Sequence, residues 1–177
     1  VGATLGKDAL STTLKAGAIG MAIIAVIMIG LYLLPGFISV LALISYVVLM
    51  LLCLNGFNAS LTLPGLAGIV LSVGMAVDAN VIIFTRIKEE LGAGASVKSA
   101  IDAGFNKALS AILDGNITTL IAAVVLYFMG IGSIKGFALT LGIGIALSMF
   151  TALFVTKHLL KAAFTLGLQS PKLYGAK

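Results

Sequence analysis

The sequence contains very little charge. Only 10% of its 177 residues are Asp, Glu, Lys or Arg, whereas about 25% is usual in a soluble domain. Hydrophobic residues make up 60% of the chain, and they form long continuous runs instead of the short alternating segments of a membrane β-barrel. These features exclude an ordinary soluble domain. They predict an all-α integral membrane protein, with residues 1–177 forming a single transmembrane domain in the lipid bilayer.

Residues that carry chemistry are also scarce, since the chain has no Trp, one Cys and one His. Cys53 has no second cysteine with which to form an internal disulfide, and His158 alone cannot build a histidine metal site. The glycines of GLAGIVLSVG lie inside an apolar run, so they do not form a nucleotide-binding loop. We therefore expect no enzymatic activity, no metal and no cofactor. The net charge of +5 does not indicate nucleic-acid binding, because the basic residues lie between or beyond the apolar runs.

Five runs are long enough to cross a membrane, which takes about 20 mostly apolar residues as a helix. They occupy residues 13–34, 37–54, 63–85, 115–130 and 136–158. Pro35 and Gly36 are expected to form the turn between the first two spans. The second span is expected to end at Asn55-Gly56-Phe57-Asn58. Pro64 falls in the first turn of the third span, where its missing N–H is tolerated.

A polar stretch from Arg86 to Asp114 separates the third and fourth spans. Ser96 is a candidate N-cap. Apolar residues then recur at helical spacing, at Val97, Ile101, Phe105, Ala108, Leu109 and Ile112. This pattern predicts an amphipathic helix over about residues 96–112, lying along the membrane surface. The alternative is a plain solvated connector.

The distribution of basic residues predicts the topology. Eight of the eleven Lys and Arg residues lie in the long polar stretch and the C-terminal tail, and basic residues mark the cytoplasmic side. We therefore expect Ala95 and Gly175 to face the cytoplasm and Gly2 to face outside. A multispan chain that begins outside without a start methionine is expected to follow an earlier span.

One carboxylate interrupts the apolar runs. No charged residue occurs from Ala16 to Val77, and seven uncharged residues separate Asp78 from Arg86. An aspartate near the centre of a span costs about 2.5–3.5 kcal/mol. Removal from water also disfavours its ionised form, so Asp78 is a candidate proton carrier. The alternative is a structural carboxyl that is hydrogen-bonded to a neighbouring helix and never titrates.

Two residues close to Asp78 extend this hypothesis. Gly74 lies one turn earlier on the same face, where it would let a companion helix approach closely. Asn80 is a second polar group in the same stretch, although a rotation of about 100° per residue turns it away from Asp78.

The fourth span opens with Asp114-Gly115-Asn116-Ile117-Thr118-Thr119. Asp114 is expected near a helix N-terminus, where the helix dipole favours a carboxylate, and capping alone would explain it. Asn116 and Thr119 are three residues apart and share a face. They are therefore the better candidates for a polar contact with the third span.

Two long stretches resemble a known family. TLPGLAGIVLSVGMAVDANVIIFTRIKEEL, residues 62–91, closely resembles the signature of SecD, the accessory subunit of bacterial protein export. AILDGNITTLIAAVVLYFMGIGSIKGFALTLGIG, residues 111–144, agrees independently. The opening LGKDALSTTLKAG is similar to the segment that leads into the family's second transmembrane helix. The resemblance therefore covers nearly the whole chain in the right order.

The resemblance implies a fold and a function. Members have six transmembrane helices with a large extracytoplasmic domain between the first two, so this chain would correspond to the last five helices, half of an RND-transporter-like fold. The family's partners are SecF and the SecYEG translocon in the bacterial inner membrane. The complex uses the proton gradient to promote late-stage preprotein translocation. The family's aspartate implicated in proton movement falls on Asp78, and preprotein contact is expected mainly through the extracytoplasmic domain.

The chain also departs from the family pattern. Gly115 stands where an alanine is usual, and Ile131 and Ser133 replace a threonine and a proline. SecF carries an arginine at the place that corresponds to Ala111, so this chain does not supply that cation. Two other functions stay open: a proton-coupled RND exporter of small molecules or lipids, and a purely structural membrane scaffold.

Overall fold

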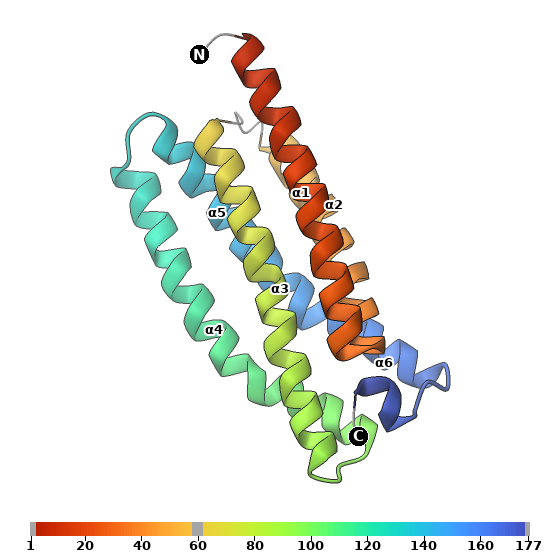
Figure 1. Cartoon of the computed structure of the whole chain (residues 1–177). Coiled ribbons are helices and arrows are strands. Elements are labelled where there is room, and N and C mark those ends of the chain that lie inside the picture. Colours follow the sequence, from red (N-terminus) through yellow and green to blue (C-terminus); the bar gives the residue numbers. More distant parts are fainter. Residues whose placement is uncertain (1–2, 58–61, 176–177) are drawn as a thin grey trace.

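The computed structural model describes residues 3–57 and 62–175, which form a helical bundle (Figure 1). Gly2 and Asn58, which enter the predicted topology and turn, lie outside the described residues. The elements in chain order are α1 (Ala3–Tyr32), α2 (Leu34–Gly56), α3 (Leu63–Gly92), α4 (Val97–Met129), α5 (Ser133–Phe150), the π-helix η1 (Thr151–Thr156), α6 (Lys157–Thr165) and the short 3-10 helix η2 (Pro171–Tyr174).

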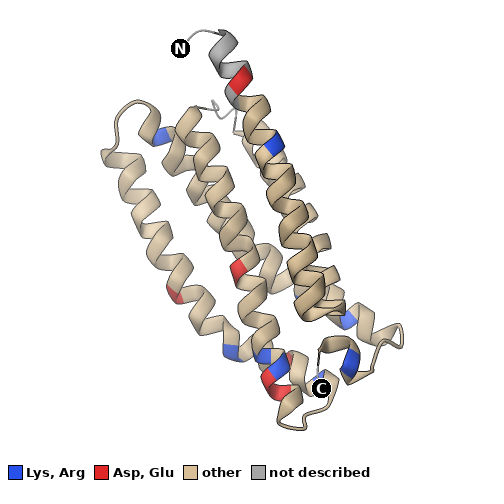
Figure 2. Ribbon diagram, in the orientation of Figure 1, with Lys and Arg blue, Asp and Glu red and all other residues tan. Residues whose placement is uncertain are grey.

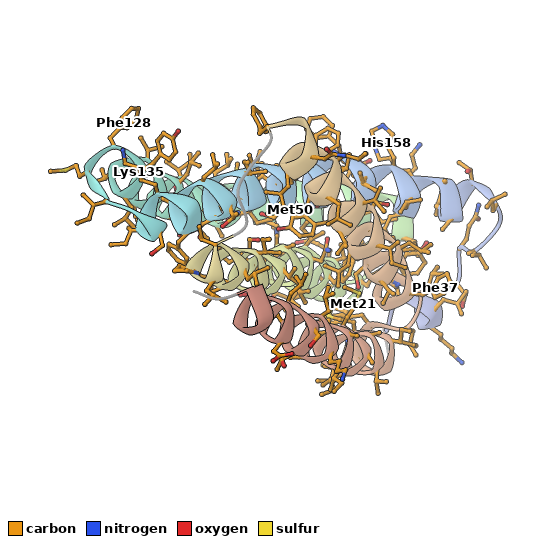
Figure 3. All side chains as sticks on the ribbon, turned by 90° about the horizontal axis from the view of Figure 1, so that it is seen from above. Met21, Phe37, Met50, Phe128, Lys135 and His158 are labelled. Carbon is orange, nitrogen blue, oxygen red and sulfur yellow. The ribbon has the colours of Figure 1, made fainter. Side chains whose placement is uncertain are left out.

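Five helices are long and apolar enough to cross a membrane, as the sequence predicts. They are α1, α2, α3, α4 and one continuous helix, Ser133–Thr165, which combines α5, η1 and α6. α3 packs against both α4 and α5, and α1 packs mainly on α2 (Figure 1). Phe128 and His158 point outward from the bundle (Figure 3), as side chains at a lipid-facing or interfacial surface do.

α3 and α4 are longer than the predicted spans. They contain 30 and 33 residues, or about 45 and 50 Å at 1.5 Å per residue, whereas the hydrocarbon core of a bilayer is about 30 Å thick. The polar stretch from Arg86 to Asp114 is therefore mostly helix, and only the short turn 93–96 separates α3 from α4.

The amphipathic segment 96–112 is helical, but it is the first half of α4 and not a separate surface helix. Ser96 is the N-cap as expected, since its Oγ accepts a hydrogen bond from the Ser99 N–H at 3.3 Å. Gly115 does not end the helix, because one glycine in a helix interior costs only about 1 kcal/mol. The apolar face, including Ile101 and Phe105, is buried in a core shared with α3 and α6, so it faces protein instead of lipid.

The turn between α1 and α2 lies two residues earlier than predicted, at Leu33 instead of Pro35. α1 ends at Tyr32, and Leu33 has a positive φ of 52°. Pro35 belongs to the first turn of α2, where proline is tolerated. Gly36 packs so closely on α1 that a Cβ there would collide with the Met28 carbonyl, so this turn needs glycine for close approach.

Charged residues gather toward the ends of the bundle (Figure 2). Among the described residues, three ion pairs lie at the end that carries the α3–α4 turn: Asp102–Lys161 at 2.8 Å, Arg86–Glu89 at 2.7 Å, and Lys107–Glu90. The ion pair of Lys107 with Glu90 joins α4 to α3, and the ion pair of Lys161 with Asp102 joins α6 to α4. All three are partly exposed, so each is expected to contribute only about 0.2–1 kcal/mol.

Candidate functional site

Asp78 lies near the middle of the 30-residue helix α3. Its side chain is exposed on the surface of the described chain and lines a cavity of about 230 Å³ between α3 and α4. The other lining residues are Met75, Ala79, Ile82, Ala111, Ile112, Gly115 and Asn116. Asp78 is therefore the single ionisable residue in the lining of a mostly apolar cavity.

Asn116 forms part of the opposite wall. It is a buried residue of α4, only 8% exposed, and lines the same cavity as Asp78. Its side chain makes no hydrogen bond within the described part of the chain, yet none of its polar atoms is fully enclosed without a partner. The amide therefore opens onto the cavity, where it is available to Asp78 or to water.

The structure does not bring Thr119 into this arrangement. Thr119 Oγ1 donates to the Gly115 carbonyl at 2.9 Å within α4, which is the usual back-bonding of threonine in a helix. Its hydroxyl is therefore already used, and Thr119 is absent from the cavity lining. Although Thr119 lies only three residues after Asn116, this spacing does not bring its side chain to the cavity that Asn116 lines.

Asp114 is not near a helix N-terminus. It is an exposed residue in the interior of α4, which begins at Val97. Capping and the N-terminal dipole, which decline within one turn, therefore do not account for it. Asp114 is also absent from the cavity lining.

Gly74 lies on an open surface. Apart from its chain neighbours and the backbone of α3 itself, no atom of the described chain comes within 4 Å of the place that a Cβ would occupy there. The close helix approach expected at Gly74 is thus not made by a helix of the described chain, and the surface formed by Gly74 and Asp78 is free to receive lipid or another protein.

Asn80 faces the opposite way, into the bundle. It is 4% exposed, and its Oδ1 accepts a hydrogen bond from Thr156 Oγ1 at 2.9 Å. Thr156 closes the π-helix η1 and is completely buried. This partner was not predicted from the sequence, because a π-turn carries no strong sequence signal; the five-residue spacing of Thr151 and Thr156 is its only trace.

Two further buried polar contacts join α3 to its neighbours, and neither was predicted from the sequence. Thr140 Oγ1 lies 2.9 Å from the Gly65 carbonyl, and the Tyr46 hydroxyl lies 2.7 Å from Ser72 Oγ. The inner side of α3 is therefore closed by paired polar groups, whereas Asp78 on the outer side has no charged partner in its cavity.

Comparisons with known proteins agree with this architecture. The family described as protein export membrane protein SecD/SecF, C-terminal, matches residues 1–165. The chain is 50% identical to the protein translocase subunit SecD of Acidaminococcus fermentans over 100% of its own length and 43% of the relative's. It is 51% identical to the SecD of Leptotrichia buccalis over 91% of this chain and 40% of that protein. The chain thus spans about two fifths of the length of these relatives.

A solved structure has the same fold. The crystal structure of SecDF from Thermus thermophilus, described as a translocon-associated membrane protein, superposes with a TM-score of 0.91 at 41% identity. The match covers 94% of this chain and 23% of that one.

Proposed function

The chain belongs to the SecD/SecF family of protein export membrane proteins, and from this premise we propose that it is the membrane part of a SecD subunit that uses the proton gradient to promote late-stage preprotein translocation. The observation that carries the proposal is Asp78, the single ionisable residue lining the cavity between α3 and α4. The names of the relatives support export of proteins over export of small molecules.

The surroundings of Asp78 support a role in proton transfer. An ionised carboxylate in the membrane is unfavourable unless a cation or water compensates it, and no cation lines the cavity. Its volume of about 230 Å³ has room for several water molecules of about 30 Å³ each. Asn116 supplies a neutral hydrogen-bonding group on the opposite wall. Asp78 would therefore accept a proton from one side of the membrane and release it when the surroundings change.

The open surface at Gly74 and Asp78 supports a partner helix from SecF. Gly74 offers close approach without collision, and the family resemblance implies a SecF arginine at the place that corresponds to Ala111. Such a cation would compensate Asp78 when it is ionised, which none of the residues lining the cavity does. We further propose that the SecD–SecF pair works with SecYEG, and that preprotein contacts come mainly from the extracytoplasmic domain of the whole protein.

The proposed membrane is the bacterial inner membrane, with the α3–α4 turn and the C-terminal tail on the cytoplasmic side. The two lie at the same end of the bundle (Figure 1), and basic residues are concentrated there. The end that carries the α4–α5 connection would then face outside.

The test is Asp78→Asn in the full-length protein together with its partner. Asparagine keeps the size and much of the hydrogen bonding but cannot ionise. We expect normal insertion and SecF association, with loss of the gradient-stimulated part of preprotein translocation into vesicles. Asp114→Asn is the control, because Asp114 is a membrane carboxyl outside the cavity, and it should keep the response. Full stimulation in the Asp78→Asn protein would refute the proton-transfer role.

A further inference from the structure

The fifth span contains a local change of helix type close to Asp78. Residues Thr151–Thr156 form a π-helix of six residues between α5 and α6. Thr151 Oγ1 contacts the Leu147 carbonyl four residues back, at 3.0 Å, whereas Thr156 Oγ1 lies 3.2 Å from the Thr151 carbonyl five residues back. A π-turn inserts one extra residue, which rotates the rest of the span by about 100° relative to a regular helix.

This rotation turns Thr156 toward α3. Its hydroxyl lies 2.9 Å from Asn80 Oδ1, and the exposed fractions of the two residues are 0% and 4%. Water has no access to the contact, so loss of the Thr156 hydroxyl would leave Asn80 Oδ1 without this hydrogen bond, which is unfavourable. π-Helices are rare and are frequently found at functional sites. The role of this one is to bring the Thr156 hydroxyl within hydrogen-bonding distance of Asn80.

Asn80 and Asp78 are rotated by about 200° from each other on α3. A contact that holds Asn80 against η1 therefore also sets the direction of Asp78, which faces the α3–α4 cavity. Ala79 lies between them and is 3% exposed. The hydrogen bonds of Gly65 and Ser72 fix α3 further toward its N-terminus, while the Asn80 contact acts within one turn of Asp78.

We propose that Asn80 and Thr156 are a positioning pair whose hydrogen bond holds Asp78 toward the cavity. When Asp78 changes charge and α3 rotates, the same hydrogen bond transmits the rotation to the fifth span. This inference rests on the proposed proton-transfer function of Asp78. According to this inference, η1 is the segment of the fifth span that moves when α3 rotates. Neither Asn80 nor Thr156 needs to ionise.

The test compares three variants of the full-length protein with its partner. Thr156→Val removes the hydroxyl at nearly constant shape, Thr156→Ser keeps it, and Thr165→Val is the matched control on the same helix, since the Thr165 hydroxyl bonds only the nearby Ala162 carbonyl at 2.8 Å. We expect Thr156→Val to reduce gradient-stimulated translocation about fivefold or more, the lower end of usual coupling between sites. Thr156→Ser and Thr165→Val should retain it.

A second measurement reports the position of α3 without relying on transport. Met75→Cys, in a Cys53→Ala background, places a thiol in the cavity lining, and its rate of labelling by a small thiol reagent should change in Thr156→Val but not in Thr165→Val. Unchanged labelling together with full stimulation overturns the positioning role. Failure of both Thr156→Val and Asn80→Ala to accumulate in the membrane also overturns it, because the pair would then serve assembly alone.

Asp78→Asn, measured in parallel, separates the two proposals. If Asp78→Asn loses the response and Thr156→Val keeps it, only the positioning role fails. If Asp78→Asn keeps the response, the proton-transfer function fails, and the Met75→Cys labelling still decides whether Thr156 orients α3.

Discussion

The two sides of α3 differ in how their polar groups are satisfied. Toward α2 and the fifth span, the buried polar groups of Gly65, Ser72 and Asn80 all have partners within the chain. Toward α4 and the surroundings, Asp78 has no cationic partner in its cavity, and a Cβ added at Gly74 would meet no described atom outside its own helix within 4 Å. The closed side contributes buried hydrogen bonds to the packing of the bundle, whereas on the open side, under the proposed function, the charge of Asp78 would be balanced by a proton or by a partner.

The largest expected effect comes from placing bulk on the closed side. A Cβ at Gly144 of α5 would collide with Ser72 and lie 2.9 Å from the Tyr46 hydroxyl. Gly144→Leu should therefore force α5 away from α3 and destabilise the bundle by about 3 kcal/mol or more, at or above the usual range for overpacking. Thermal unfolding of the purified protein in detergent measures this loss. A protein as stable as the wild type would show that the α3–α5 contact is looser than described.

The same substitution on the open side should have a different consequence. The Cβ that Gly74→Leu adds meets no atom outside the backbone of its own helix within 4 Å, and leucine improves helix propensity, so the thermal stability of the isolated chain should stay within about 1 kcal/mol of the wild type. Its association with SecF should fall, because a leucine obstructs the close approach. Co-purification of SecF with the variant measures this, and unchanged recovery would mean that the partner binds elsewhere.

The smallest expected effect comes from removing one polar partner on the closed side. Tyr46→Phe deletes the hydroxyl that pairs with Ser72 at 2.7 Å, but Ser72 Oγ keeps its contact with the Ile69 carbonyl at 2.8 Å. Hydrogen bonds between membrane helices contribute about 0.6 kcal/mol on average, so we expect a loss of that size in an unfolding titration. A loss above about 2 kcal/mol, beyond the range measured for such bonds, would show that Ser72 depends on Tyr46 more than this geometry implies.

The number of spans could be predicted from the sequence, but their ends could not. Apolar runs report where a helix meets lipid, and charged residues such as Lys88 and Glu90 mark where it leaves the bilayer. Neither residue type stops a helix, so α3 continues to Gly92 and α4 begins at Val97. The predicted place of Asp114 was wrong for the same reason, because the start of a membrane span is not the start of a helix.

The candidate site was predictable in part. Asp78 stood out because charge is so rare in the surrounding sequence, and the short spacing to Asn80 was enough to place these two on different faces. The partners were not predictable in the same way. Thr156 reaches Asn80 only because η1 changes the helix register, and the cavity depends on how α3 and α4 lie against each other, which periodicity within one helix does not specify.

The uninterrupted course of α3 has a mechanical consequence. One continuous helix runs from Leu63 past Asp78 to the turn at 93–96, so each half behaves as a stiff arm of about 20 Å. A tilt of about 10° around its middle would displace the end of such an arm by about 4 Å, and the packing of α4 against α3 would draw α4 along with it. A change in the charge of one intramembrane carboxyl would in this way become a movement several ångströms wide at the end of the bundle that carries the α3–α4 turn.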